Sequence, residues 1–95
     1  SRSPVKADPA AGQLLVSLRI ASEAGVRSTC SWALGRLMAQ LVQPRQAEIV
    51  EALVSALLHD GEISVRDEAR TALEQLEDPL VLERLQALIN DGFIL

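Results

Sequence analysis

The chain has 95 residues, of which 48% are hydrophobic, 2% aromatic and 23% charged. This length suits one small domain, and the apolar content excludes an intrinsically disordered chain. The net charge of −4 divides unevenly: residues 1–45 carry six basic and two acidic side chains, whereas residues 46–95 carry three basic and eleven acidic ones. The acidic half argues against a nucleic-acid partner. No apolar run approaches the roughly 18 residues of a membrane span, so we expect no membrane partner either.

The first eight residues differ in composition from the rest of the chain. Residues 1–8 are mostly polar, and we expect them to form a flexible tail ahead of a single domain at 9–95. The segment Ser3-Pro4-Val5-Lys6 resembles the site of a proline-directed kinase. Ser3 is therefore a candidate phosphorylation site, and the alternative is that the tail is an inert linker.

Three prolines recur with a spacing of 35 residues, at Pro9, Pro44 and Pro79. Proline suits the first turn of a helix, where its missing N–H has no partner within the helix anyway. Each of the three also precedes an apolar pattern with helical spacing. Asp8 and Asp78 stand directly before two of the prolines and could cap the free N–H groups. The spacing thus predicts three repeat units, each opening with a helix.

Two further internal matches complete the set of helices. The pair Val26-Arg27 matches Val65-Arg66 at an offset of 39 residues, and both pairs continue into an apolar stripe with helical spacing. Segment 56–61 resembles segment 87–92, and both end in glycine, which tolerates the left-handed conformation found after helices. Together the patterns predict five helices, near residues 9–23, 26–41, 45–59, 64–76 and 79–90. We predict no strand.

The predicted fold class is all-α, with short connections that make successive helices antiparallel. We expect an α-solenoid of about two and a half stacked helical hairpins, with repeats near 9–41 and 44–76 and a partial repeat at 79–92. One hairpin is too small to bury its apolar face alone, and stacks usually need about three units. We therefore expect capped ends, a longer chain around this segment, or an oligomer.

These repeats resemble the HEAT repeats, a family related to the armadillo repeats. One unit carries the residues typical of the family, Pro44, Asp60, Val65 and Arg66. The preceding unit carries Pro9, Val26 and Arg27, with Ala21 where Asp60 would align. The missing aspartate removes the basis for an Asp–Arg contact in that unit. The resemblance implies stacked right-handed hairpins that form a curved surface for holding other proteins.

No group of residues predicts catalysis. His59, Asp60 and Glu62 form the one candidate metal site, and a lone imidazole without a second histidine or a cysteine makes a poor one. Cys30 falls on the predicted buried stripe, where it is a packing residue rather than a nucleophile. We therefore expect no catalytic residue, no metal and no cofactor, and the chain is not predicted to be an enzyme.

Trp32 is the candidate centre of a binding surface. On a helical projection it lies well away from the apolar stripe of its helix, beside Arg36. We expect the matching side of the other second helix to present Asp67, Arg70 and Glu74, which gives a protein-binding face of one aromatic and charges of both signs. The alternative is that Trp32 packs against the first helix or covers the N-terminal end of the stack.

The apolar C-terminal residues Phe93, Ile94 and Leu95 have two interpretations. In one they fold back over the last helix, and in the other they are an exposed end contact that joins another chain or a neighbouring repeat. The second interpretation allows a homo-oligomer through the open ends of the solenoid. The single Cys30 suits the reducing cytoplasm, and the nucleus equally.

The sequence therefore predicts a non-catalytic protein–protein interaction module that binds a partner peptide or helix on the face formed by its second helices. The alternative is a structural segment or C-terminal cap of a larger HEAT-repeat scaffold or oligomer, whose partners are neighbouring repeats and which has no separate ligand.

Overall fold

The computed structural model describes residues 4–95, which form five α-helices and one short 3₁₀ turn. In chain order these are α1 (Pro4–Ile20), α2 (Ala24–Leu37), the turn η1 (Met38–Gln40), α3 (Arg45–His59), α4 (Ile63–Gln75) and α5 (Pro79–Asn90). None of the described residues forms a strand, so the predicted all-α fold class is confirmed. The predicted ranges of α3 and α5 agree with the structure at both ends.

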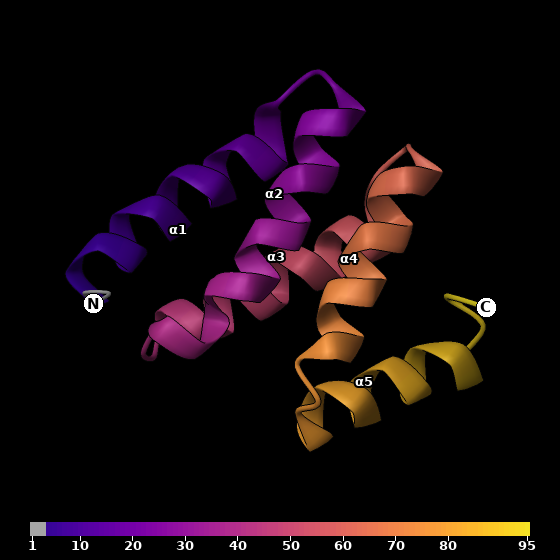
Figure 1. The fold of residues 1–95 in the computed structure, drawn as a ribbon. Coiled ribbons are helices and arrows are strands. Elements are labelled where there is room, and N and C mark those ends of the chain that lie inside the picture. The colour runs from indigo at the N-terminus through magenta and orange to yellow at the C-terminus, as the bar shows by residue number, and fades with distance from the viewer. Residues whose placement is uncertain (1–3) are drawn as a thin grey trace.

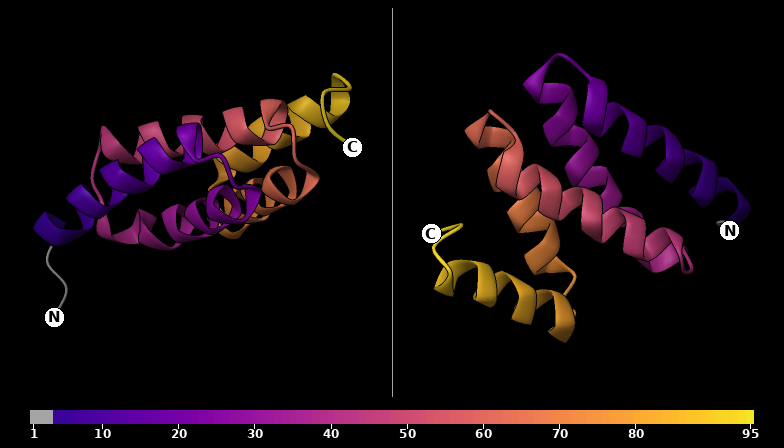
Figure 2. Two further views of the ribbon diagram at one scale, coloured as in Figure 1. Left: turned by 90° about the horizontal axis from the view of Figure 1, so that it is seen from above. Right: turned by 180° about the vertical axis from the view of Figure 1, so that it is seen from behind.

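The helices form two layers (Figures 1 and 2). Helix α1 packs antiparallel on α2, α3 packs on α4, and the second helices α2 and α4 lie side by side (Figure 1). The left view of Figure 2 shows α1, α3 and α5 in one layer above α2 and α4. The principal extents of 41 × 32 × 18 Å fit this arrangement, because packed helix axes lie about 8–10 Å apart. The described chain thus contains two stacked hairpins and the first helix of a third.

The hydrophobic core lies between the two layers and receives side chains from every helix. Five of its large side chains have no exposed surface: Leu34, Ile49, Leu53, Val65 and Leu73. They come from α2, α3 and α4, whose apolar residues recur at the three- and four-residue spacing that places them on one face. Helix α5 buries only Val81 and Leu85, so the third unit is attached to the core by a smaller apolar surface.

Helix α1 begins five residues earlier than predicted, at Pro4, and Pro9 lies inside it rather than in its first turn. The predicted tail at 1–8 is therefore wrong for residues 4–8, and Ser3 lies outside the described residues. Two contacts account for the longer helix. Ala7 is buried in the core, and the Asp8 carboxylate accepts a hydrogen bond from Arg45 Nε of α3 at 2.9 Å instead of capping a helix.

The helix ends follow the predicted signals only in part. Asp78 caps α5 as expected, since its carboxylate accepts a hydrogen bond from the Leu80 N–H at 2.9 Å. Gly92 adopts a left-handed φ of 82° after α5, also as expected. Gly61 does not, because the chain leaves α3 through an extended Asp60. After α4 the left-handed position is occupied by Glu77, with φ 53°, although its side chain disfavours that conformation.

Arg27 and Asp60 connect the first hairpin to the second. The Arg27 guanidinium donates two hydrogen bonds to the Asp60 carboxylate, at 2.9 and 3.1 Å, across 33 residues of sequence. Arg27 also donates to the Ala21 carbonyl at 2.7 Å, and Arg66 donates to the Asp60 carbonyl at the same distance. Within each hairpin, the arginine of the second helix therefore donates to a backbone carbonyl. The Asp60 side chain does not pair with the arginine of its own hairpin but joins the two hairpins by binding Arg27.

Candidate protein-binding groove

A groove runs between α2 and α4 on the outer side of the second-helix layer. It consists of two adjoining cavities of about 140 and 330 Å³, which share Gly35, Arg36 and Gln75 as lining residues. Trp32, Glu68 and Ala72 complete the first cavity; Met38, Ala39, Gln46, Leu76 and Asp78 complete the second. The groove thus has an aromatic side chain at one end and an acidic residue of the α4–α5 connection at the other.

Trp32 and Arg36 form one unit on the wall contributed by α2. They are four residues apart and project from the same face of the helix, so the Arg36 guanidinium carbon lies 5.6 Å from the centre of the indole ring. This is the distance of a cation–π contact. The Trp32 side chain nevertheless stays 51% exposed. The arginine therefore orients the ring without covering it, and a large aromatic surface remains open at the end of the groove.

Gly35 and Ala72 set the depth of the groove. A Cβ atom on Gly35 would lie 3.1 Å from the Ala72 Cβ, which is closer than ordinary van der Waals contact. The absent side chain lets the α2 backbone approach α4 closely, so the floor of the groove is backbone and a methyl group. A larger residue at position 35 would both separate the helices and fill the cavity.

The predicted five-residue surface is divided between two places in the structure. Trp32 and Arg36 meet in the groove, whereas Asp67 and Arg70 line a separate cavity on the opposite flank of α4. Glu74 accepts a hydrogen bond from Arg70 Nε at 3.3 Å. The groove instead receives Glu68 and Gln75 from α4. The reason is geometric: α2 and α4 lie side by side, so the groove is bounded by the flank of α4 that faces α2 and not by its exposed crest.

Sequence reasoning missed two groove residues of α4, Glu68 and Ala72. They lie four residues apart, and Gln75 follows three residues later, so all three share one face of the helix. A small residue between two polar ones at that spacing is compatible with a close helix contact. The rotation of α4 about its own axis was needed to choose this face over the neighbouring one.

The cavity lined by Asp67 and Arg70, of about 390 Å³, lies outside the groove and beside the C-terminal segment. The backbone N–H groups of Phe93 and Ile94 donate to the Leu88 carbonyl, which turns the chain back toward α4 (Figure 1). Only Ile94 then packs on the core, while Phe93 and Leu95 remain 68% and 101% exposed. The chain therefore turns back, but toward α4 and not over the last helix, and the two other apolar side chains stay exposed.

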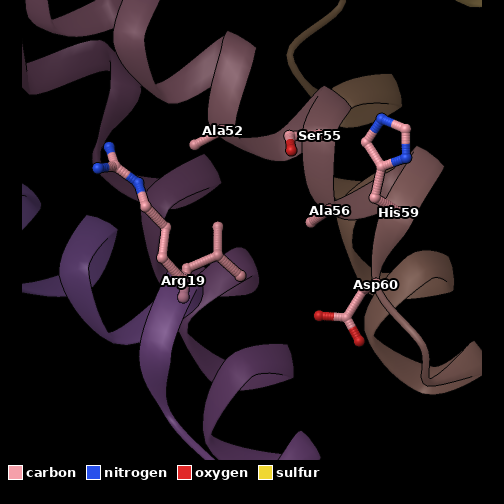
Figure 3. A pocket seen from close by; sticks show the side chains of 7 residues that line it. Arg19, Ala52, Ser55, Ala56, His59 and Asp60 are labelled. Carbon is pink, nitrogen blue, oxygen red and sulfur yellow. The ribbon is translucent and has the colours of Figure 1, made fainter.

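Another cavity, of about 300 Å³, lies between α1 and α3 (Figure 3). Arg19 extends from α1 on one side, His59 extends from the end of α3 on the other, and Ser55 lies between them. Asp60 at its edge is engaged with Arg27, and the Arg27 hydrogen bonds hold the pKa of Asp60 below its ordinary value. Within the described part of the chain, no three histidine, cysteine or acidic side chains gather closely enough to hold a metal ion.

Cys30 lies in the core, 5% exposed, where the sequence placed it. Burial raises the pKa of its thiol, and a hydrogen bond with Ser17 opposes this in part. A thiol in such surroundings stays protonated at neutral pH and is a weak nucleophile.

No helix among residues 4–95 has the length and apolar character needed to cross a membrane. Comparison of the chain with protein-family models, curated protein sequences and solved structures finds no match. The geometry of the groove is therefore the basis for the function proposed below.

Proposed function

We propose that this chain is a non-catalytic interaction module of the HEAT-like type, which binds a peptide or short helix of a partner protein in the groove between α2 and α4. The observation that carries the proposal is the half-exposed Trp32, held by Arg36 at the end of a groove. Exposed tryptophan and arginine side chains dominate the energetics of many protein interfaces. A cytoplasmic or nuclear location is part of the proposal and rests on the single reduced cysteine.

The charges along the groove favour one class of partner. Arg36 is basic, whereas Glu68 and Asp78 are acidic, and all three line the cavities. A polyanion would meet two carboxylates, and a polycation would meet the guanidinium. A segment with charges of both signs and one apolar side chain to cover the indole ring is the complementary ligand.

The test uses Trp32 both as a contact and as a reporter, because it is the only tryptophan of the chain. Proteins retained by the immobilised chain are identified, and their candidate segments are titrated as peptides while Trp32 fluorescence is recorded. We expect Trp32→Ala to weaken binding by roughly 2 kcal/mol, about 30-fold in Kd, because truncating a hot-spot tryptophan removes most of its buried contact. The melting temperature should stay close to that of the wild type.

Val16→Ala is the matched control. Val16 is 50% exposed, as Trp32 is, but it lies on α1 in the other layer. We expect this variant to bind like the wild type. Equal losses in both variants, or a destabilised Trp32→Ala protein with intact binding, would contradict the proposed groove.

A structural role is the second candidate, and the exposed apolar side chains Ile63, Phe93 and Leu95 favour it. In this role the chain is a segment or C-terminal cap of a larger HEAT-like scaffold or oligomer, and the groove has no separate ligand. Trp32→Ala would then leave every interaction of the protein unchanged, whereas substitutions at the C-terminal segment would not.

A further inference from the structure

Two charged side chains at the Trp32 end of the groove have no ionic partner among residues 4–95. Glu68 is half-buried in the wall of the smaller cavity, and its carboxylate forms no ion pair with any described side chain. Arg36 forms none either, and its described contact is the one with the Trp32 ring, at 5.6 Å. This part of the groove therefore presents one carboxylate and one guanidinium that a bound segment can pair with.

The two charges come from opposite walls and lie at different levels along the groove. Helices α2 and α4 run in the same direction, and Gly35 meets Ala72 where they approach closely (Figure 1). Glu68 precedes Ala72 by four residues, which places it about 6 Å before that contact along the helix axis. Trp32 precedes Gly35 by three residues and lies on the same side of the contact, whereas Arg36 is level with it. The indole ring and the carboxylate thus line one cavity from opposite walls, and the guanidinium follows about one helical turn further along.

We propose that the partner's anchor in this cavity is a lysine or arginine side chain, accompanied on the partner by an acidic side chain about 6 Å further along the groove. The inference rests on the proposed function and names the chemistry of the bound segment. The basic head pairs with Glu68, and its methylene stem covers the open part of the Trp32 ring. The acidic side chain pairs with Arg36, so both charges of the groove are matched at once.

The surroundings of Glu68 favour a basic anchor over the alternatives. An apolar anchor would take water from the half-buried carboxylate without replacing its interactions, and an acidic anchor would add repulsion. The other carboxylate of the groove, Asp78, lies at the far end and caps α5 through the Leu80 N–H. Glu68 is therefore the acidic group available beside the indole ring, and Arg36 is the basic one.

The first experiment selects from a displayed library of random peptides of about 15 residues, roughly four helical turns. Peptides enriched by the wild type but not by Trp32→Ala should carry a lysine or arginine with an acidic residue two to four positions away. In the strongest of these peptides, the basic residue is replaced by leucine and binding to the wild-type protein is followed by Trp32 fluorescence. We expect at least about tenfold weaker binding, because leucine covers the ring but leaves the Glu68 carboxylate without a cation.

The second experiment exchanges the charges. Glu68→Lys should weaken binding of the original peptide at least about tenfold, because two cations then meet. A peptide with glutamate in place of the basic residue should bind the Glu68→Lys protein more tightly than it binds the wild type, a gain that a merely structural role of Glu68 would not produce. Glu83→Lys is the matched control, since it is the same change at an exposed position on α5 outside both cavities of the groove. We expect it to bind the original peptide like the wild type.

The outcomes separate this inference from the proposed function. Peptides that depend on Trp32 but lack the basic residue, or that tolerate its replacement by leucine, would overturn the basic anchor and leave the groove as the binding site. A Glu68→Lys protein that binds the original peptide like the wild type would do the same. Enriched peptides that bind independently of Trp32, or a library without enriched peptides, would contradict the proposed function and this inference with it.

Discussion

Replacement of Leu34 by alanine tests the packing of the two stacked hairpins. Leu34 lies on α2 and Leu73 occupies the matching position on α4, and neither has any exposed surface. Truncating such a side chain forfeits its transfer free energy and leaves a cavity, which together cost roughly 2–5 kcal/mol. A domain of this length has a total stability of about 5–14 kcal/mol. We expect each substitution to lower the free energy of unfolding by about 3 kcal/mol, a large share of that total.

The assay is urea unfolding followed by far-UV circular dichroism. The slope of the free energy of unfolding against urea concentration should be the same in the wild type and the variants. Leu80→Ala is the matched control, because it is the same chemical change at a position that is 77% exposed on α5. We expect the control to change the stability by less than about 0.5 kcal/mol. A Leu34→Ala variant within about 1 kcal/mol of the wild type, or a control as damaging as Leu34→Ala, would show that the core does not lie between the two helix layers.

Three further predictions concern single positions. Asp60→Asn should lower Tm at neutral pH. Hydrogen bonds from Arg27 lower the pKa of Asp60 from its ordinary 3.8, so the stabilisation by this carboxylate is complete above pH 3.8 and is lost as the pH falls through the lowered pKa. A difference in Tm between wild type and variant that is the same at all pH values would refute the pairing. Ser31→Ala should stabilise the protein by about 1 kcal/mol in urea unfolding, because the buried Ser31 hydroxyl has no hydrogen-bond partner in the described chain; a loss of stability would reveal a missed partner. Glu77→Gly should raise the free energy of unfolding by up to about 1 kcal/mol, and Tm with it, because glycine adopts φ 53° without strain. An unchanged or lower Tm would argue against a left-handed residue at this position.

The candidate site shows which parts of a surface a sequence can specify. The four-residue spacing and the distance from the apolar stripe place Trp32 beside Arg36 and away from the core, and in the structure Trp32 is 51% exposed with Arg36 over its ring. The α4 residues that line the groove could not be predicted in this way. The helical pattern identifies the core face of α4, but two other flanks remain, and the one that meets the groove depends on where α2 lies.

The pattern of apolar residues determined the helices themselves. Short-range interactions place α3 and α5 at their predicted bounds, because Pro79 and its capping Asp78 act within one turn and apolar side chains recur with the period of the helix. The all-α class and the antiparallel hairpins also follow from this level, since three-residue connections permit little else. Such features depend on residues close together in the chain, and the sequence displays them directly.

Only the tertiary structure decided the contacts between hairpins. Helix α1 extends back to Pro4 because Ala7 reaches the core and Asp8 reaches Arg45, 37 residues away. Asp60 pairs with Arg27 of the preceding hairpin, although Arg66 is much nearer in sequence. The same holds for the C-terminal segment, whose direction depends on the two backbone hydrogen bonds to the Leu88 carbonyl and on the hydrogen bond that Arg70 donates to the Leu95 carbonyl. These contacts depend on how whole helices are rotated and stacked against one another, and the local sequence pattern does not determine that geometry.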